Sequence, residues 1–251
     1  MSRATVSLSI VIPAYNEATR LPATLSRLTT YLAGQTWDWE IRVVDDGSTD
    51  GTADVAARAA AREPRIVAQR EPHRGKGGAV RAGLLAARGA YRFMCDADLS
   101  MPPEELPRFL PPVLDGFDVA IGSREGQGAR RVGEPWRRHF IGRVFNRVIQ
   151  LLVIRGVEDT QCGFKMFTAE AAERIFPRTT LDGWAFDVEV LGLARVMQMR
   201  VVEVPIEWHH RGESQVSPFR DGIAMFADLL RIRARLRRVA PGAGRPPTSP
   251  S

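Results

Sequence analysis

Short apolar runs alternate with segments of helical pattern through the first hundred residues of the chain. Runs of strand length cover residues 8–13, 40–45, 65–68 and 90–95. Between the first two runs, leucines recur at helical spacing, at Leu21, Leu25, Leu28 and Leu32. Alanine-rich helical segments follow the second and third runs. Strands separated by helices of this length predict βαβ units and a parallel sheet.

The second half of the chain is less regular. Strands are expected at 117–122 and, as a pair, within 200–208, and a strongly apolar helix is expected over 141–154. A last helix begins near Phe219, and its apolar stripe and arginine-rich final turns are amphipathic. The stripe consists of Phe219, Ile223, Phe226 and Leu230, and the arginines are Arg231, Arg233, Arg235, Arg237 and Arg238.

Three of the predicted strands end in polar clusters, which are Pro13 to Glu17, Asp45-Asp46 and Asp96-Ala97-Asp98. Ligands of parallel sheets bind beyond the carboxyl ends of the strands, so the clusters predict one shared site. Asp96 and Asp98, two residues apart after a buried strand, would repel each other and be costly to desolvate alone. Because Mg²⁺ takes one or two carboxylates and completes its shell with water and phosphates, they predict a metal beside a phosphorylated substrate. The alternative for an isolated pair is a solvated turn.

Composition limits the class of protein. The 251 residues suffice for one large α/β domain, and no apolar stretch reaches the roughly 18 residues of a membrane span. Cys95 and Cys162 fit neither a disulfide framework nor a zinc spacing, and the first residues carry no secretory pattern, so we expect a cytoplasmic protein. The net charge of +6 favours an anionic partner. Lys76 and Lys165, the only lysines, are candidates for functional positions.

Seven sequence blocks together resemble the glycosyltransferases of family 2, which have the GT-A fold. In chain order they are P-A-Y-N-E, V-V-D-D-G-S-T-D-G-T, G-K-G-G-A-V, D-A-D, G-S-R, D-T-Q-C-G-F-K and W-A-F-D-V-E, within residues 6–238. The last two blocks resemble the dolichyl-phosphate β-glucosyltransferases and their prokaryotic polyprenyl-phosphate relatives. The resemblance implies an α/β, Rossmann-like, mainly parallel sheet flanked by helices. It implies a GT-A catalytic domain over 1–217, a basic amphipathic helix over 218–239 and a disordered tail over 240–251.

The resemblance also implies a reaction. A hexose, with glucose from UDP-glucose preferred, would move to a polyprenyl or dolichyl phosphate with inversion, giving a β-linked lipid phosphate. GDP-mannose as donor, or a soluble acceptor, remains an alternative on the same fold. The isoelectric point near 10.1 raises a nucleic-acid-binding protein as an alternative of another class. Three tyrosines, no recognisable docking motif and strand-end carboxylates that repel phosphates argue against it.

The matching positions acquire implied roles. Asp45 or Asp46 would accept a hydrogen bond from the nucleotide base, and Asp96 and Asp98 would hold Mg²⁺ or Mn²⁺, with Ser100 contributing through water. The preferred role of Asp187 and Glu189 would be to bind sugar hydroxyls and orient the acceptor, with base catalysis as the second choice. A base is not required, because a phosphomonoester with a second pKa near ~6 is already nucleophilic. Other donor contacts would come from Pro13, Ala14, Tyr15, Glu17 and Lys76. Phosphate contacts would come from Arg124 and from Arg137 or Arg138, and the sugar and acceptor side from Gln161, Lys165 and Trp184.

A lipid acceptor requires contact with a bilayer. The apolar helix at 141–154 lies beside an arginine cluster, and the helix at 219–238 pairs an apolar stripe with basic residues, which is typical of interfacial helices. We therefore expect a peripheral protein on the cytoplasmic face of the membrane. The alternative is that both helices pack on the core with a solvated basic face.

Overall fold

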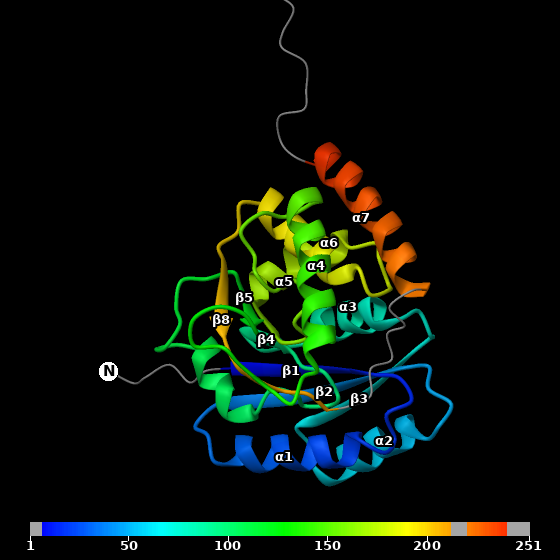
Figure 1. Cartoon of the computed structure of the whole chain (residues 1–251). Helices are drawn as coiled ribbons and strands as arrows, with labels where there is room; N and C mark the ends of the chain where they lie inside the picture. Colours follow the sequence, from blue (N-terminus) through cyan, green and yellow to red (C-terminus); the bar gives the residue numbers. More distant parts are fainter. Residues whose placement is uncertain (1–6, 212–219, 240–251) are drawn as a thin grey trace, which may run out of the picture.

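A seven-stranded sheet forms the centre of the computed structural model, which describes residues 7–211 and 220–239 (Figure 1). Its strand order is β3-β2-β1-β4-β7-β5-β8, and only β7 runs antiparallel to its neighbours. The predicted, mainly parallel sheet is therefore confirmed. The strands are β1 (Ser7–Ala14), β2 (Asp38–Asp46), β3 (Ile66–Glu71), β4 (Tyr91–Met94), β5 (Val119–Ser123), β7 (Lys165–Thr168) and β8 (Val201–Pro205).

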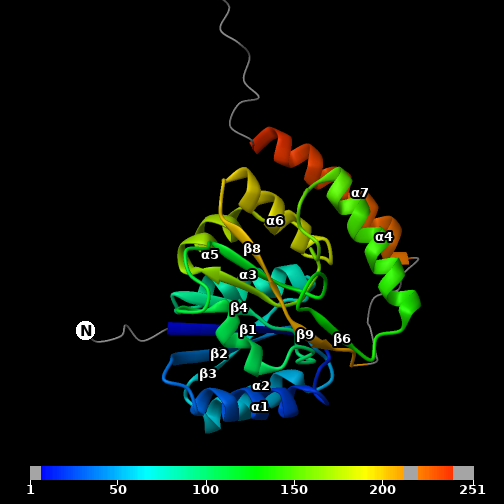
Figure 2. The ribbon, with the colours of Figure 1, turned by 60° about the vertical axis from the view of Figure 1, so that its left-hand side comes forward.

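Helices cover both faces of the sheet. Figure 1 shows α1 (Leu21–Ala33) and α2 (Thr52–Arg62) below it, and α3 (Lys76–Ala86), α5 (Ala169–Ile175) and α6 (Phe186–Val196) above it. Short 3₁₀ turns lie at η1 (Pro103–Phe109) and η2 (Phe176–Arg178). A small parallel pair joins β6 (Arg130–Val132) to β9 (Glu207–His209). The remaining helices, α4 (Trp136–Leu152) and α7 (Arg220–Val239), run along the outside (Figure 2).

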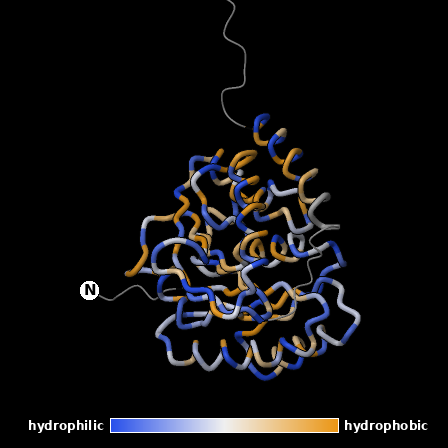
Figure 3. Tube along the Cα trace, in the orientation of Figure 1, coloured by the Kyte–Doolittle hydropathy of each residue, from blue (hydrophilic) through white to orange (hydrophobic). Residues whose placement is uncertain are grey.

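The sequence pattern explains this arrangement. Ile10, Val11 and Ile12 in β1 are fully buried because both faces of a doubly covered parallel sheet are apolar. The four leucines of α1 are buried against the sheet, as the helical spacing predicted. The α3 helix approaches the sheet closely at Gly83, where an added Cβ would overlap the side chains of Val11 and Val44. Figure 3 shows the resulting interior as mainly hydrophobic segments between the layers.

The outer helices differ from the sequence expectation. Helix α4 begins at Trp136, five residues before the predicted start, because Pro135 precedes it as a suitable helix boundary. In α7 the buried side chains are Met225, Leu229, Ile232 and Leu236, whereas Phe226 and Leu230 of the predicted stripe are exposed. Phe219 and the tail over 240–251 lie outside the described residues, as does the side chain of Ile223.

Candidate active site

The carboxyl ends of β1, β2 and β4 lie side by side and bring the three predicted polar clusters together. Ala14 pairs with Asp45, and Val11 pairs with Met94, so the loops after the strands start at one sheet edge. The first two loops are also bonded to each other, because the Asn16 N–H donates to Ser48 Oγ at 2.9 Å and the Thr49 N–H to Asn16 Oδ1 at 3.0 Å. Asn16 has a φ of 55°, a left-handed conformation that asparagine adopts more readily than most residues.

Asp45 and Asp46 have different surroundings. Both carboxylate oxygens of Asp46 accept backbone N–H groups, from Arg74 and from Gly75 at 2.9 Å each, and thereby fix the loop before α3. Asp45 Oδ1 accepts the Ser48 N–H at 3.2 Å, but its buried Oδ2 accepts no hydrogen bond in the described chain. The nearest charge is Arg70 Nε, 3.5 Å from Asp45 Oδ2. Of the two aspartates, Asp45 therefore retains an acceptor atom for a ligand.

The ring of Tyr15 stacks on His73, with ring centroids 4.1 Å apart. His73 Nδ1 lies 2.9 Å from Asp46 Oδ2, so the same aspartate also fixes this ring. The sequence reasoning named Tyr15 but missed His73, which follows β3 and reaches the site only through the fold. Pro13 and Ala14 lie at the end of β1, and they position the loop through backbone pairing with β2.

Asp96, Asp98 and Lys76 form the charged centre of the site. Lys76 Nζ, at the start of α3, lies 2.5 Å from Asp96 Oδ1. Burial would lower the pKa of Lys76, but the carboxylates of Asp96, Asp187 and Asp98 outweigh it and raise that pKa. Burial and the Asp96 charge raise the pKa of Asp98, although the Ser100 N–H donates to Asp98 Oδ1 at 3.0 Å. The two aspartates therefore keep an excess of negative charge despite the lysine.

Glu17 belongs to the same electrostatic group. Burial raises the pKa of Glu17 against the opposing charge of Arg20, and the charges of Asp98, Asp50 and Asp96 raise it further. The Glu17 N–H donates to Thr52 Oγ1 at 2.8 Å, which fixes the backbone at the end of the first loop. Carboxylates from the second and third loops thus raise the pKa of a residue in the first loop, in agreement with the predicted convergence.

The donor set fits a divalent cation. Two carboxylates raise the local negative potential, and Ser100 Oγ is buried without a hydrogen-bond partner in the described chain. Within residues 7–211 and 220–239, no three His, Cys, Asp or Glu side chains gather as a metal-binding group. A hard cation takes one or two carboxylates and obtains its other ligands from substrate phosphates and water.

The segment from Asp159 to Lys165 closes over Asp96. At Gly163 an added Cβ would overlap the Asp96 carboxylate, so only glycine allows this approach. Lys165 does not face the site as an open sugar-binding group. Its Nζ lies 2.6 Å from Asp187 Oδ1 and donates to the Cys162 carbonyl at 2.6 Å, and its side chain is only 1% exposed. Gln161, in the same segment, is half-buried.

Asp187 and Glu189, at the start of α6, have separate functions in the structure. Burial raises the pKa of Asp187, while Lys165 and Lys76 oppose it, so Asp187 lies within the charged centre. Both oxygens of Glu189 are occupied by hydrogen bonds from Thr180 and Leu181 and by Arg235 of α7. Glu189 therefore anchors α7 and the loop before α6, which is a positioning role.

Trp184 lies at the rim of the site. Its side chain is partly exposed, and Lys76 Nζ lies 5.7 Å from the centre of its ring. An aromatic face beside a lysine is suited to packing against a sugar ring. The sequence expectation for Trp184 is compatible with this position.

Arg124 is held by a partner that the sequence reasoning did not identify. Its Nε and Nη2 donate to the two oxygens of Asp159 at 2.7 and 2.8 Å, and its guanidinium lies 5.3 Å from the Trp208 ring. Although burial opposes the shift, Asp159 raises the pKa of Arg124 and Arg124 lowers that of Asp159. Glu203 in turn fixes the backbone at Asp159, because its carboxylate accepts hydrogen bonds from the N–H groups of Glu158 and Asp159.

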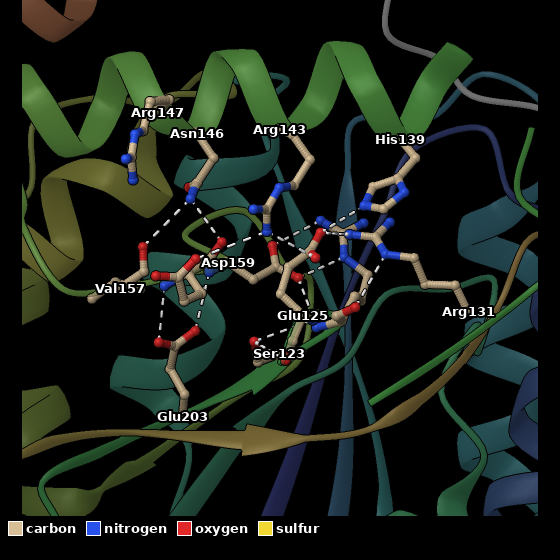
Figure 4. Close-up of polar contacts among 12 residues, drawn as sticks. Ser123, Glu125, Arg131, His139, Arg143, Asn146, Arg147, Val157, Asp159 and Glu203 are labelled. Atoms are coloured by element: carbon tan, nitrogen blue, oxygen red, sulfur yellow. Dashed lines mark hydrogen bonds and ion pairs between the residues drawn. The ribbon is translucent and has the colours of Figure 1, made fainter. Parts of the chain in front are cut away.

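A polar cluster joins α4 to the loop that contains Arg124. Glu125 accepts from Arg131 at 2.5 Å and from Arg143 at 3.0 Å, and it contacts His139 at 3.1 Å. Figure 4 shows His139, Arg143 and Asn146 pointing from α4 toward these loops. Arg137 is exposed, with its guanidinium 5.5 Å from the centre of the Trp136 ring, and the Arg138 side chain lies outside the described residues. The prediction that one of these two arginines contacts phosphate stays a prediction, with both residues as candidates.

Solved structures of known proteins have the same fold. Glucosyl-3-phosphoglycerate synthase from Mycobacterium tuberculosis, in complex with UDP, superimposes with a TM-score of 0.65 at 19% identity, covering 96% of this chain and 83% of that one. Mannosyl-3-phosphoglycerate synthase from Rubrobacter xylanophilus gives a TM-score of 0.67 at 21% identity, covering 93% and 74%. The fold and the carboxylate-rich strand edge define the GT-A class, as the sequence predicted.

Sequence similarity specifies the family within that class. The model of glycosyl transferase family 2 matches residues 9–176, and the chain belongs to this family. It is 36% identical over 245 residues to the dolichyl-phosphate beta-glucosyltransferase of Dictyostelium discoideum, covering 92% of this chain and 75% of that protein. The human protein of the same name is 34% identical over 247 residues, covering 92% and 76%. The predicted resemblance is confirmed.

We expect Trp184→Ala to raise the KM for the sugar donor several-fold while changing the free energy of unfolding by less than about 0.5 kcal/mol, because the side chain is partly exposed. Initial-rate kinetics and urea unfolding measure the two quantities. Trp37→Ala, at a partly buried tryptophan just before the amino-terminal end of β2, is the control for losing a tryptophan. An unchanged KM would contradict a sugar-binding role for Trp184.

Proposed function

We propose that this protein transfers glucose from UDP-glucose to a polyprenyl phosphate, with inversion at the anomeric carbon. The observation that carries the proposal is its similarity, over about nine-tenths of the chain, to proteins named dolichyl-phosphate beta-glucosyltransferase. The site geometry supports it, because the buried Asp45 Oδ2 atom, the carboxylate pair of Asp96 and Asp98 and two half-buried cations, Lys76 and Arg124, lie at one sheet edge. The Asp45 oxygen suits a nucleotide base, and the carboxylate pair suits a diphosphate. The two cations suit the phosphate of the substrate that accepts the sugar.

The donor would bind across the first three loops. Asp45 Oδ2, which accepts no hydrogen bond from the described chain, would accept one from the base, while Asp46 holds the surrounding loop. Tyr15 and His73 would border the base, and Glu17 would meet the ribose. Lys76 would attract the diphosphate through its charge and its place at a helix N-terminus. Asp98, supported by Asp96 and Ser100, would hold Mg²⁺ or Mn²⁺, which when bound stabilises negative charge on the leaving diphosphate.

The acceptor phosphate attacks C1 of the sugar, and the nucleoside diphosphate leaves from the opposite face. A phosphomonoester is largely deprotonated at neutral pH, because its second pKa is near ~6, so the attack needs no strong protein base. Arg124, fixed in orientation by Asp159, offers a guanidinium for phosphate oxygens on the acceptor side. Asp187 and Trp184 would orient the sugar, and Lys76 would offset the charge of Asp96 while the diphosphate departs.

A panel of donors tests the proposal. UDP-glucose, UDP-galactose and GDP-mannose are each offered with polyprenyl phosphate or a soluble phosphorylated acceptor, in the presence of Mg²⁺ or Mn²⁺. We expect labelled product that extracts into organic solvent only with polyprenyl phosphate, and fastest with UDP-glucose. Preferred transfer from GDP-mannose, or to the soluble acceptor, would overturn the substrate assignment. Omission of metal and addition of EDTA are the controls for cation dependence.

The prenyl chain of such an acceptor resides in a bilayer. No helix in the described part of the chain has the length and apolarity needed to cross a membrane. We therefore propose that the protein works as a peripheral protein at the cytoplasmic face. The catalytic α/β unit over 1–217 would bind both substrates, with the helix over 218–239 as an accessory element.

A further inference from the structure

The turn that follows β4 has a strained backbone. Leu99 has a φ of 46°, in the left-handed region, which a bulky residue such as leucine rarely adopts. Its side chain is only 4% exposed, so packing in the core holds it in place. The Leu99 N–H donates to the Asp96 carbonyl at 3.1 Å and closes a tight turn over Ala97 and Asp98. Strain of this kind persists only where the surroundings fix the backbone, and it is typical of functional sites.

The same turn carries two carboxylates of like charge. Burial and the charge of Asp96 raise the pKa of Asp98, which shows that the negative charge at Asp98 is unfavourable in this position. Lys76 Nζ lies 2.5 Å from Asp96 Oδ1 and offsets part of this charge. A turn that was free to relax would move the carboxylates apart before a cation bound. Contacts from outside the turn must therefore hold it.

Two hydrogen bonds from other elements hold the turn. The His209 N–H of β9 donates to the Ser100 carbonyl at 2.8 Å. The Thr24 hydroxyl of α1 donates to the Ala97 carbonyl, between the two aspartates, at 2.6 Å. Thr24 is only 5% exposed, and 73 residues separate it from Ala97. Helix α1, which lies below the sheet in Figure 1, is thus bonded directly to the centre of the turn.

Helix formation does not account for the direction of the Thr24 hydroxyl. A threonine hydroxyl inside a helix commonly donates to the carbonyl four residues earlier, and Thr29 of the same helix donates to the Leu25 carbonyl at 2.8 Å. The Thr24 hydroxyl instead donates to a buried carbonyl outside its helix. Valine would fill nearly the same space at position 24 but would lack this donor. The position therefore needs a hydroxyl for the sake of the turn rather than for the helix.

We infer that Thr24 is a positioning residue for the divalent cation, because its hydroxyl holds the Asp96–Asp98 turn in place before the cation binds. The inference rests on the proposed function, of which the cation is a part. Thr24 acts through the backbone of Ala97 and not by contact with a substrate. A turn that is already ordered loses less conformational freedom on binding. Loss of the hydroxyl should therefore weaken cation binding without abolishing the transfer reaction.

Binding of Mn²⁺ to the full chain, measured by electron paramagnetic resonance with and without UDP, tests the inference. We expect Thr24→Val to weaken Mn²⁺ binding about two- to tenfold, the factor that one net hydrogen bond contributes. Thr24→Ser keeps the hydroxyl and should restore binding. Thr29→Val is the matched control, because the Thr29 hydroxyl donates only to carbonyls of α1. Urea unfolding verifies that each variant is folded.

The metal dependence of transfer separates positioning from a general loss of structure. In Thr24→Val, glucosyl transfer should require more Mn²⁺ to reach half of its maximal rate, in proportion to the weaker binding. The rate at saturating Mn²⁺ should approach that of the wild type, because the bound cation then holds the carboxylates itself. A purely structural defect would lower the maximal rate and leave the Mn²⁺ requirement unchanged.

Amide hydrogen exchange in the metal-free protein measures the anchoring directly. We expect the amides of Leu99 and Ser100 to exchange about two- to tenfold faster in Thr24→Val, because the lost hydrogen bond lowers the free energy of local opening. Exchange of these amides should be unchanged in Thr29→Val. This measurement needs neither substrate nor cation, so its outcome does not depend on the proposed function.

Equal Mn²⁺ affinity of the wild type and Thr24→Val would overturn the inference, as would an equal loss in Thr29→Val. Unchanged exchange at Leu99 and Ser100 would also overturn it. A wild-type protein that binds Mn²⁺ but transfers no glucose would reject the proposed function, while the inference would stand on the binding data. A wild-type protein that binds no Mn²⁺, with or without UDP, would reject the cation site and the inference together.

Discussion

We expect Asp98→Asn to lower glucosyl transfer by at least about 100-fold, the scale of losing one group that stabilises developing charge. Asparagine keeps the size of the side chain but removes the negative charge that would hold the cation. The measurement is the rate of labelled lipid product from UDP-glucose, with Mg²⁺ or Mn²⁺ varied over a wide range. Because Asp96 remains, a high metal concentration should restore only part of the rate.

The same substitution should raise the stability of the metal-free protein, which excludes misfolding as the cause of lost activity. Burial and Asp96 raise the pKa of Asp98 in the folded state, so the folded protein binds this proton more tightly than the unfolded chain does. The charged carboxylate then destabilises the fold at any pH above the folded-state value. The gain from asparagine should be full above the folded-state pKa of Asp98 and should vanish as the pH falls below the unfolded-state value of about 3.9.

Urea unfolding of both proteins across this pH range, in EDTA, measures the gain. Asp38→Asn is the matched control, because Asp38 is an exposed aspartate at the other end of β2 from Asp46. That control should change neither transfer nor stability. Near-normal turnover of Asp98→Asn would contradict the metal assignment, and a loss of stability at neutral pH would contradict the electrostatic account.

The convergence of Asp45, Asp96 and Tyr15 could be predicted from sequence because it depends on local patterns and one general rule. Each residue follows an apolar run, and parallel strands place their carboxyl ends at one edge. The antiparallel β7 was not expected in this sheet, since the run of Lys165 to Thr168 carries no signal for its direction. Strand order in the second half depends on packing that a short pattern does not encode.

The partners of charged residues could not be predicted for a similar reason. Asp159 lies 35 residues after Arg124, and Arg235 lies 46 residues after Glu189, so no sequence spacing relates them. For Lys165 a signal did exist, because it stands between Phe164 and Met166 in a buried strand. In α7 two apolar stripes have acceptable helical spacing, and only the contact with α6 determines which of them is buried.

The buried pair of Lys165 and Asp187 gives the second large expected effect. Lys165→Met should lower the free energy of unfolding by about 3–5 kcal/mol, because it leaves the buried Asp187 carboxylate without its nearest cation. It also removes the donor to the Cys162 carbonyl. Urea unfolding measures the loss, and Lys165→Arg, which keeps the charge but exceeds the available space, should lose less.

The double variant Lys165→Met, Asp187→Leu separates structure from chemistry. Replacing both members of a buried ion pair by apolar residues is often neutral, so stability should recover most of the loss. Transfer should nevertheless stay low, because Asp187 is close enough to Lys76 and Asp96 for their charges to influence its pKa. If Asp187 only balanced the charge of Lys165, activity would return with the fold. Recovery of both quantities would therefore assign the pair to the core, whereas recovery of stability alone would assign Asp187 to the site that binds the sugar.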